Sequence, residues 1–206
     1  MKNYILSMAL VAAALALGAA PANAVTIDFQ SLEHVDAFPV QHGFLYSEDG
    51  FTLSASGAFG FASYGTGATY FPGSTALFNG TTSGVTELAL TGGGSFSLVS
   101  IDLVELAFAN VRGVSFIGDV SGGGVIGQTF ALDGMEGAQT FTFPSFIGWD
   151  NVIKVSWSND SAFSHQFDNI VASATNGTAV PEPASLGLLG LGFAGLAWAR
   201  RGARQQ

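Results

Sequence analysis

Short runs of alternating apolar and polar residues, separated by glycine turns, extend from residue 25 to residue 179 and constrain the fold more than any other feature. The alternation is clear in Thr-Phe-Thr-Phe at 140–143 and in Ile-Lys-Val-Ser-Trp at 153–157. A period of two is typical of strands with one buried face. Asn79-Gly80 and Asp133-Gly134 are strong turn dipeptides, and no amphipathic helix of ten residues interrupts the pattern. We therefore predict an all-β domain.

About ten short strands are expected in this domain. Glycine makes up 22 of its 155 residues, about twice the usual share of roughly 7%, and supplies the turns. Short strands at regular spacing predict two packed antiparallel sheets, a β-sandwich of jelly-roll type. The expected strands are 25–30, 51–55, 74–78, 87–90, 95–106, 113–118, 126–132, 139–143, 152–158 and 166–174.

The amino terminus has the three parts of a secretory signal peptide. Lys2 gives a positive start, residues 4–17 form an apolar stretch, and Ala22-Asn23-Ala24 is an A-x-A cleavage site. We therefore predict a signal peptide at 1–24, whose removal makes Val25 the first residue of a body at 25–179. A retained membrane anchor is the alternative, but the apolar stretch is short for a span.

The carboxyl end consists of a proline box, an apolar stretch and a basic end. Pro181-Glu182-Pro183 cannot be helical and stays open to a processing enzyme. Residues 184–199 carry no charge and predict a membrane helix of roughly 24 Å, slightly short of the roughly 30 Å hydrocarbon core. Arg200, Arg201 and Arg204 would hold its far end in the cytoplasm. A core helix of a soluble domain is the alternative, but no polar face marks one.

These three parts, in this order, closely resemble the PEP-CTERM sorting signal of Gram-negative bacteria. That signal has a Val-Pro-Glu-Pro box, here residues 180–183, then a short membrane helix and a basic end. The resemblance covers residues 180–204 and implies an exosortase-type protease that cuts near the box. It also implies export, with transient anchoring in the inner membrane, to the cell envelope surface or the extracellular space.

The body carries a second, looser resemblance. Residues 92–105, 128–134 and 167–171 look like the uncharacterised extracellular domains that often precede this sorting signal. Those domains are similar to galactose-binding and carbohydrate-binding jelly rolls. The resemblance implies a galactose-binding-like β-sandwich, and it implies no particular ligand.

Charge and cysteine content exclude several classes of partner and site. Residues 25–179 hold two basic and fourteen acidic side chains, a net charge of −12, whereas a nucleic-acid partner needs a basic face. Cations and neutral polymers fit this surface better. The chain has no cysteine, which excludes disulfides and thiolate metal sites.

The sequence lacks the motifs of common catalytic sites. Its histidines, His34, His42 and His165, belong to no H-E-x-x-H motif, and no G-x-S-x-G occurs. A Ser-His-Asp site assembled only by the fold stays open. Paired carboxylates could serve glycoside hydrolysis, but chance pairing on an acidic sheet explains them equally well. We expect no catalytic residue, and the pairs considered are Asp102 with Glu105 and Asp133 with Glu136.

Carboxylates near both ends of the body are candidates for a structural calcium site. Carbohydrate-binding jelly rolls, which the body resembles, commonly hold calcium where the first and last strands meet, and oxygen ligands suit this cation. The resemblance thus implies calcium at Asp28, Glu33 and Asp168. The alternative is that these are ordinary edge or turn carboxylates.

A glycine-rich segment at 57–73 carries five aromatic side chains. Flat rings on a loop can stack on sugar rings, and tyrosine hydroxyls can hydrogen-bond to them. Tyr64, Tyr70 and Phe71 are therefore candidate glycan contacts. Half-buried strands of a phenylalanine-rich core are the alternative, because they have the same composition.

These features predict a non-enzymatic, exported surface or extracellular-matrix protein that associates with exopolysaccharide. A carbohydrate-binding module with a specific glycan ligand is the first alternative, and a polysaccharide-degrading enzyme is the second. The expected partners are an exosortase-type protease and exopolysaccharide, with calcium as a structural cofactor and without nucleic acid.

Overall fold

The computed structural model describes residues 24–106, 112–158 and 165–175. The predicted signal peptide, apart from Ala24, and the predicted sorting tail lie outside these residues. In the part of the chain that is described, no helix is long and apolar enough to cross a membrane.

The described residues form thirteen strands and two short 3₁₀ helices. Every strand pair is antiparallel. The strands are β1 (Val25–Ile27), β2 (Val40–Gly43), β3 (Leu45–Glu48), β4 (Phe51–Ala55), β5 (Phe61–Ser63), β6 (Leu77–Asn79), β7 (Val85–Leu90), β8 (Phe96–Glu105), β9 (Arg112–Val120), β10 (Val125–Leu132), β11 (Ala138–Thr142), β12 (Val152–Ser158) and β13 (His165–Ala174), and the helices are η1 (Gln30–Leu32) and η2 (Ser145–Ile147).

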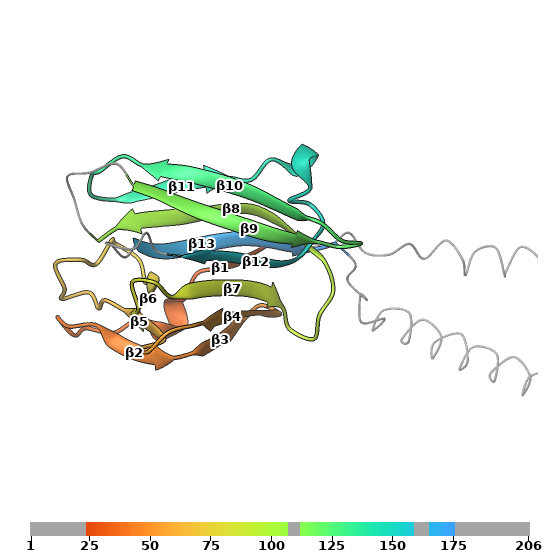
Figure 1. The fold of residues 1–206 in the computed structure, drawn as a ribbon. Helices are drawn as coiled ribbons and strands as arrows, with labels where there is room; N and C mark the ends of the chain where they lie inside the picture. The colour runs from red at the N-terminus through yellow and green to blue at the C-terminus, as the bar shows by residue number, and fades with distance from the viewer. Residues whose placement is uncertain (1–23, 107–111, 159–164, 176–206) are drawn as a thin grey trace, which may run out of the picture. The chain divides into compact units, whose positions relative to one another are not determined.

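The strands are arranged as two sheets that join at one residue pair, Val152 of β12 with Phe96 of β8. One sheet has the order β2-β5-β6-β13-β8-β11, with β1 also paired to β13, and the other has the order β3-β4-β7-β12-β9-β10. From β6 to β13 the chain changes sheet at every connection except the hairpin between β9 and β10, so that β6-β13-β8-β11 and β7-β12-β9-β10 form the two four-stranded sheets of a jelly roll (Figure 1). The predicted all-β antiparallel sandwich is confirmed.

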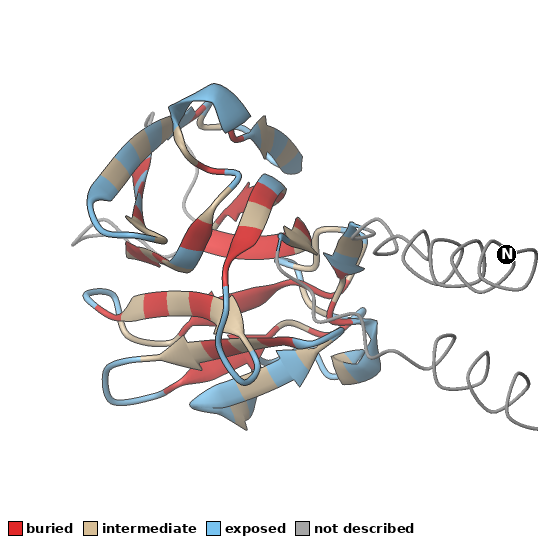
Figure 2. Cartoon of the chain, turned by 90° about the vertical axis from the view of Figure 1, so that its right-hand side faces the viewer, coloured by how far each residue is buried: buried red, intermediate tan, exposed pale blue. Residues whose placement is uncertain are grey.

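Aromatic side chains pack the two sheets against each other. Phe167 of β13 meets Trp157 of β12 edge to face, with ring centroids 5.2 Å apart. Phe51 of β4 meets Phe96 of β8 in the same way at 5.3 Å. All four side chains are buried, and burial of each contributes about 1.5–3 kcal/mol. Buried residues lie along the strands in the middle of the body, and exposed residues lie on its loops and outer strands (Figure 2).

Every expected strand range overlaps an observed strand, and β4 and β12 have the predicted bounds. The prediction missed β2, β3 and β5. All three residues of β5 are buried, so it has no alternation to detect. The sequence does carry a signal for β3, the turn dipeptide Asp49-Gly50. These two residues have φ angles of 48° and 81° and join Glu48 to its partner Phe51. Two consecutive positive φ angles are typical of a type I′ hairpin turn.

Gly60, just before β5, is required by both its backbone angle and its surroundings. Its φ is +65°, and a Cβ atom there would lie 2.3 Å from the carbonyl oxygen of Gly43 on the paired strand β2. A backbone atom cannot move aside without disturbing that pairing. Gly50 also has a positive φ, +81°, but nothing lies within 4 Å of its Cβ position.

We expect Gly60→Ala to lower the free energy of unfolding by about 3 kcal/mol or more, since a left-handed backbone angle and a steric clash both act there. The control Gly50→Ala places alanine at a left-handed backbone angle without a steric clash, and it should lower the free energy of unfolding by about 1 kcal/mol. Urea unfolding of the two full-length variants measures the difference. Equal losses would show that the contact with Gly43 does not constrain the fold.

Candidate functional site

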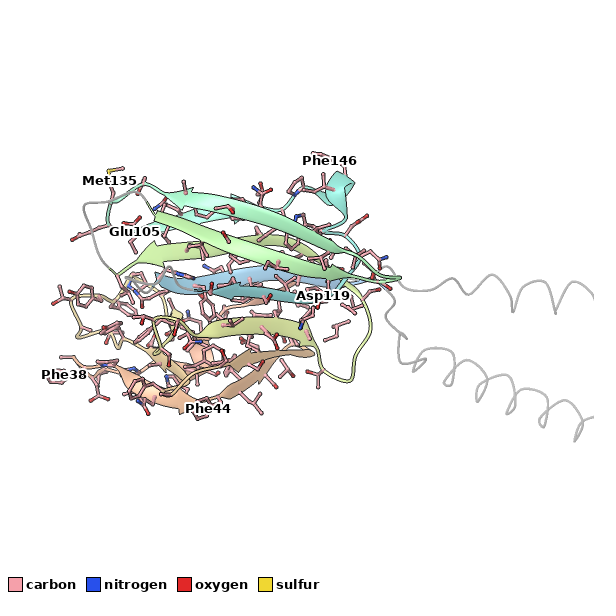
Figure 3. The ribbon with its side chains drawn as sticks, in the orientation of Figure 1. Phe38, Phe44, Glu105, Asp119, Met135 and Phe146 are labelled. Atoms are coloured by element: carbon pink, nitrogen blue, oxygen red, sulfur yellow. The ribbon has the colours of Figure 1, made fainter. Side chains whose placement is uncertain are left out.

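A pocket of about 260 Å³ forms where three segments far apart in the sequence meet. Residues 69–72 come from the loop between β5 and β6, Val104 and Glu105 from the end of β8, and Glu136 and Gly137 from the turn between β10 and β11. Glu105 lies at the same end of the strands as Met135 (Figure 3). Only the folded jelly roll brings these residues together.

Glu105 forms part of the pocket wall and is incompletely hydrogen-bonded. It is 3% exposed, and its Oε1 atom accepts a hydrogen bond of 3.0 Å from the Gly134 amide. Its Oε2 atom is buried, and none of the described residues donates a hydrogen bond to it. A buried polar atom without a partner costs roughly 1–3 kcal/mol. A ligand that donates to this oxygen would recover part of that energy.

Tyr70 and Phe71, two of the predicted glycan contacts, both line the pocket. The Tyr70 residue is 41% exposed. Its carbonyl oxygen accepts a hydrogen bond of 2.9 Å from the side-chain amide of Gln166, which is fully buried on β13. Strand β13 therefore fixes the loop that presents both aromatic rings.

Tyr64, the third predicted contact, lies behind Tyr70 and is absent from the pocket lining. Its ring stacks on Phe78 at a centroid distance of 5.2 Å and is tilted against Tyr70 at 5.3 Å. Burial, with a smaller contribution from Tyr70, raises the pKa of the Tyr64 hydroxyl. Tyr64 thus supports the Tyr70 ring from the side of the core.

The carboxylate pairs considered from sequence are rearranged by the fold. Glu105 and Glu136 line the same pocket, whereas their sequence neighbours are engaged elsewhere. Asp102 is half-buried and accepts hydrogen bonds from the Thr140 hydroxyl at 2.5 Å and the Asn169 side-chain amide at 2.9 Å. Asp133 accepts hydrogen bonds from the Met135 amide in its own turn and from the Gln139 side chain on β11.

Asp168 is the most buried of the predicted calcium ligands. It accepts hydrogen bonds from the Ser74 hydroxyl and, at 2.7 Å, from the Asn169 amide. The pKa of its carboxyl group is raised to about 6, chiefly by burial; the two hydrogen bonds lower the pKa, and the charges of Asp102 and Asp28 contribute to the rise. Several carboxylates therefore repel one another around Asp168, and a cation would relieve that repulsion.

The fold brings Asp28 close enough to interact with Asp168, and Asp28 also accepts a hydrogen bond from the Gln30 amide. Glu33 is exposed at the end of η1. Within residues 24–106, 112–158 and 165–175, no three His, Cys, Asp or Glu side chains are grouped so that they could hold a metal ion. The side-chain atoms near Asp168 that could bind a metal ion are oxygens, which suit calcium. Glu33, however, does not join Asp28 and Asp168 in a group of three ligands. Calcium binding stays a prediction.

A serine, two histidines and an aspartate also meet, as the open alternative of a Ser-His-Asp site requires. The Nε2 atoms of His34 and His42 lie 3.2 and 2.7 Å from the Ser63 hydroxyl, and His34 Nδ1 lies 3.4 Å from an Asp36 carboxylate oxygen. A nucleophile must be reachable by its substrate, and Ser63 is fully buried in β5. This group therefore tethers the loop after η1 to β5.

Comparison with known proteins identifies the carboxyl end. Residues 179–201 match the family model described as the PEP-CTERM protein-sorting motif, which confirms the resemblance found in the sequence. The motif marks the chain as an exported protein with a C-terminal sorting signal. No curated protein matches the chain.

Two solved structures are similar to the chain at 14% sequence identity, and each alignment covers 75% of it. One is a family 11 carbohydrate-binding module from Clostridium thermocellum in complex with a β-1,3-1,4-mixed-linked tetrasaccharide, with a TM-score of 0.33 and 97% of that chain covered. The other is the family 11 module of a cellulosomal cellulase from the same organism, with a TM-score of 0.31 and 96% covered. Similarity at this level says nothing about the ligand of this chain.

Proposed function

We propose that this chain, with its PEP-CTERM motif, is a non-enzymatic surface or extracellular-matrix protein whose β-sandwich binds exopolysaccharide. The pocket lined by Tyr70, Phe71, Glu105 and Glu136 is the proposed binding site. Exosortase-type processing releases the body from the inner membrane to the cell envelope surface or the extracellular space.

The observation that carries this proposal is the combination of exposed aromatic surface with an unsatisfied buried carboxylate in one pocket. Aromatic rings with a few convergent polar groups are typical of small-molecule sites. Tyr70 offers a ring face, and Glu105 offers an acceptor that no described residue uses. A sugar ring has both an apolar face and hydroxyl donors, so it matches this pair of features.

Binding is favoured over hydrolysis by the state of Glu105. Glycoside hydrolysis generally needs two carboxyl groups flanking the scissile bond. Glu136 is exposed, but the Glu105 carboxyl group is buried and held through one oxygen by the Gly134 amide. In this position Glu105 cannot flank a glycosidic bond opposite Glu136, and it accepts a hydrogen bond from a ligand only after its carboxyl group turns toward the pocket. We therefore expect no reducing sugar to be released from polysaccharide.

We expect Tyr70→Ala to weaken binding of exopolysaccharide from the producing bacterium by about tenfold, because the variant loses an aromatic face worth roughly 1–1.5 kcal/mol. Affinity electrophoresis with the purified full-length protein measures the change. Phe146→Ala is the matched control, since Phe146 is 87% exposed on η2, outside the pocket lining. Equal weakening by both variants, or none by Tyr70→Ala, would contradict the site.

Calcium at Asp28 and Asp168 is a separate proposal, supported by their mutual repulsion in the absence of a cation. Extracellular calcium sites bind at roughly 10⁻⁴–10⁻³ M. About 10 mM calcium acting on a site of about 10⁻⁴ M would stabilise the protein by roughly 2.7 kcal/mol and raise the melting temperature by about 5–10 °C. Differential scanning fluorimetry in calcium and in magnesium measures the shift.

Asp168→Asn should abolish the calcium response, and the control Asp133→Asn should retain it. The same rise in magnesium, which resists losing its water ligands, would mean that simple screening and not a site produces the effect. Loss of the response in Asp133→Asn as well would place any site outside the Asp28 and Asp168 group.

Processing gives a prediction for the ends of the mature chain. Cleavage after Ala24 and near Pro181-Glu182-Pro183 should leave a species that runs from Val25 to about Val180. Intact-mass measurement of the protein recovered from the medium or the outer surface tests this. Recovery there of a species that still carries Arg200 and Arg201 would refute exosortase-type cleavage.

A further inference from the structure

The charged side chains that line the pocket are all acidic. Glu105 lies in the wall and Glu136 at the exposed rim, and the other described lining residues carry no charge. Lys154, on β12, is committed to two acidic partners, with its Nζ atom 3.1 Å from Glu87 and 3.4 Å from Asp119. The described lining residues therefore include no basic side chain that could pair with an anionic group of a ligand.

Glu105 adds a specific requirement to this negative charge. Its Oε2 atom is buried and has no donor among the described residues, so a ligand donor becomes its partner once the carboxyl group turns toward the pocket. A hydroxyl group can donate to it, but an ammonium group makes a charge-assisted hydrogen bond roughly twice as strong.

The aromatic part of the lining favours the same ligand group. The electron-rich face of a tyrosine ring attracts a cation placed within about 6 Å of its centre. Tyr70 is 41% exposed in the lining that also contains Glu136. Two carboxylates and an exposed aromatic ring in one pocket therefore suit a sugar that carries an ammonium group better than a neutral or an acidic sugar.

We infer that the pocket recognises a sugar unit that carries a free amino group, and that it discriminates against uronic acids. The inference rests on the proposed polysaccharide binding and narrows its ligand to amine-bearing polysaccharide. The pocket volume of about 260 Å³ lies just below the roughly 300–1,000 Å³ usual for drug-sized ligands. One amino sugar of a chain would enter it, and the rest of the polymer would remain outside.

Four oligosaccharides of equal length test the inference by isothermal titration calorimetry with the full-length protein. They are tetramers of glucosamine, N-acetylglucosamine, glucose and galacturonic acid. We expect the glucosamine tetramer to bind at least tenfold more tightly than the N-acetylated and glucose tetramers, and the galacturonate tetramer not to bind. Glu136→Gln and Glu105→Gln should each cost about tenfold for the glucosamine tetramer and less than twofold for the N-acetylated one.

The control Asp49→Asn removes one charge from the turn between β3 and β4 and keeps a residue that tolerates its φ of 48°. Its affinity for the glucosamine tetramer should be unchanged, and a loss equal to that of Glu136→Gln would overturn the inference. Because Glu136 is exposed, its variant stays informative if Glu105→Gln fails to fold.

The remaining outcomes separate the two levels of the proposal. Equal binding of the glucosamine and N-acetylglucosamine tetramers would overturn amine recognition and leave polysaccharide binding in place. Binding of a tetralysine peptide as tight as that of the glucosamine tetramer would overturn recognition of a sugar. If none of the four tetramers and no native exopolysaccharide binds, the proposed function itself fails.

Discussion

The edge-to-face contact between Phe167 and Trp157 is the interaction on which the rest of the sandwich depends. Phe167 lies on β13, which pairs with β1, β6 and β8, and its ring also meets Phe29 at 5.8 Å and Phe61 at 6.1 Å. Trp157 lies on β12 in the other sheet. The chain has no cysteine, so apolar packing of this kind, and not a disulfide, must hold the sheets together.

The same strand also builds the candidate site. Gln166 and Asp168 flank Phe167, and successive side chains of a strand point to opposite faces, so burying Phe167 in the core directs its two polar neighbours away from it. Gln166 then binds the carbonyl group of Tyr70, and Asp168 binds the hydroxyl group of Ser74. Packing of the core thereby sets the position of the loop that lines the pocket. A loss of packing at Phe167 should therefore disturb the core and this loop together.

Sequence reasoning located part of the site and missed its chemistry. Tyr70 and Phe71 were recognised as candidate glycan contacts because aromatic residues among glycines are conspicuous, and both lie in the pocket wall. Glu105 and Glu136 were matched with their near neighbours Asp102 and Asp133, because spacing along the chain gives only local partners. Their proximity arises from β11 pairing with β8, a contact that no local pattern encodes.

The sequence by itself determined the all-β class, most strand positions and the sorting signal, because alternation, turn dipeptides and the proline box are properties of a few consecutive residues. Only the tertiary structure decided which strands pair, which faces are buried and which carboxylates share a pocket. Those outcomes depend on the free energy of packing surfaces that are distant in the chain. For that reason the fully buried strand β5 and the pocket wall at Glu105 became visible only in the folded molecule.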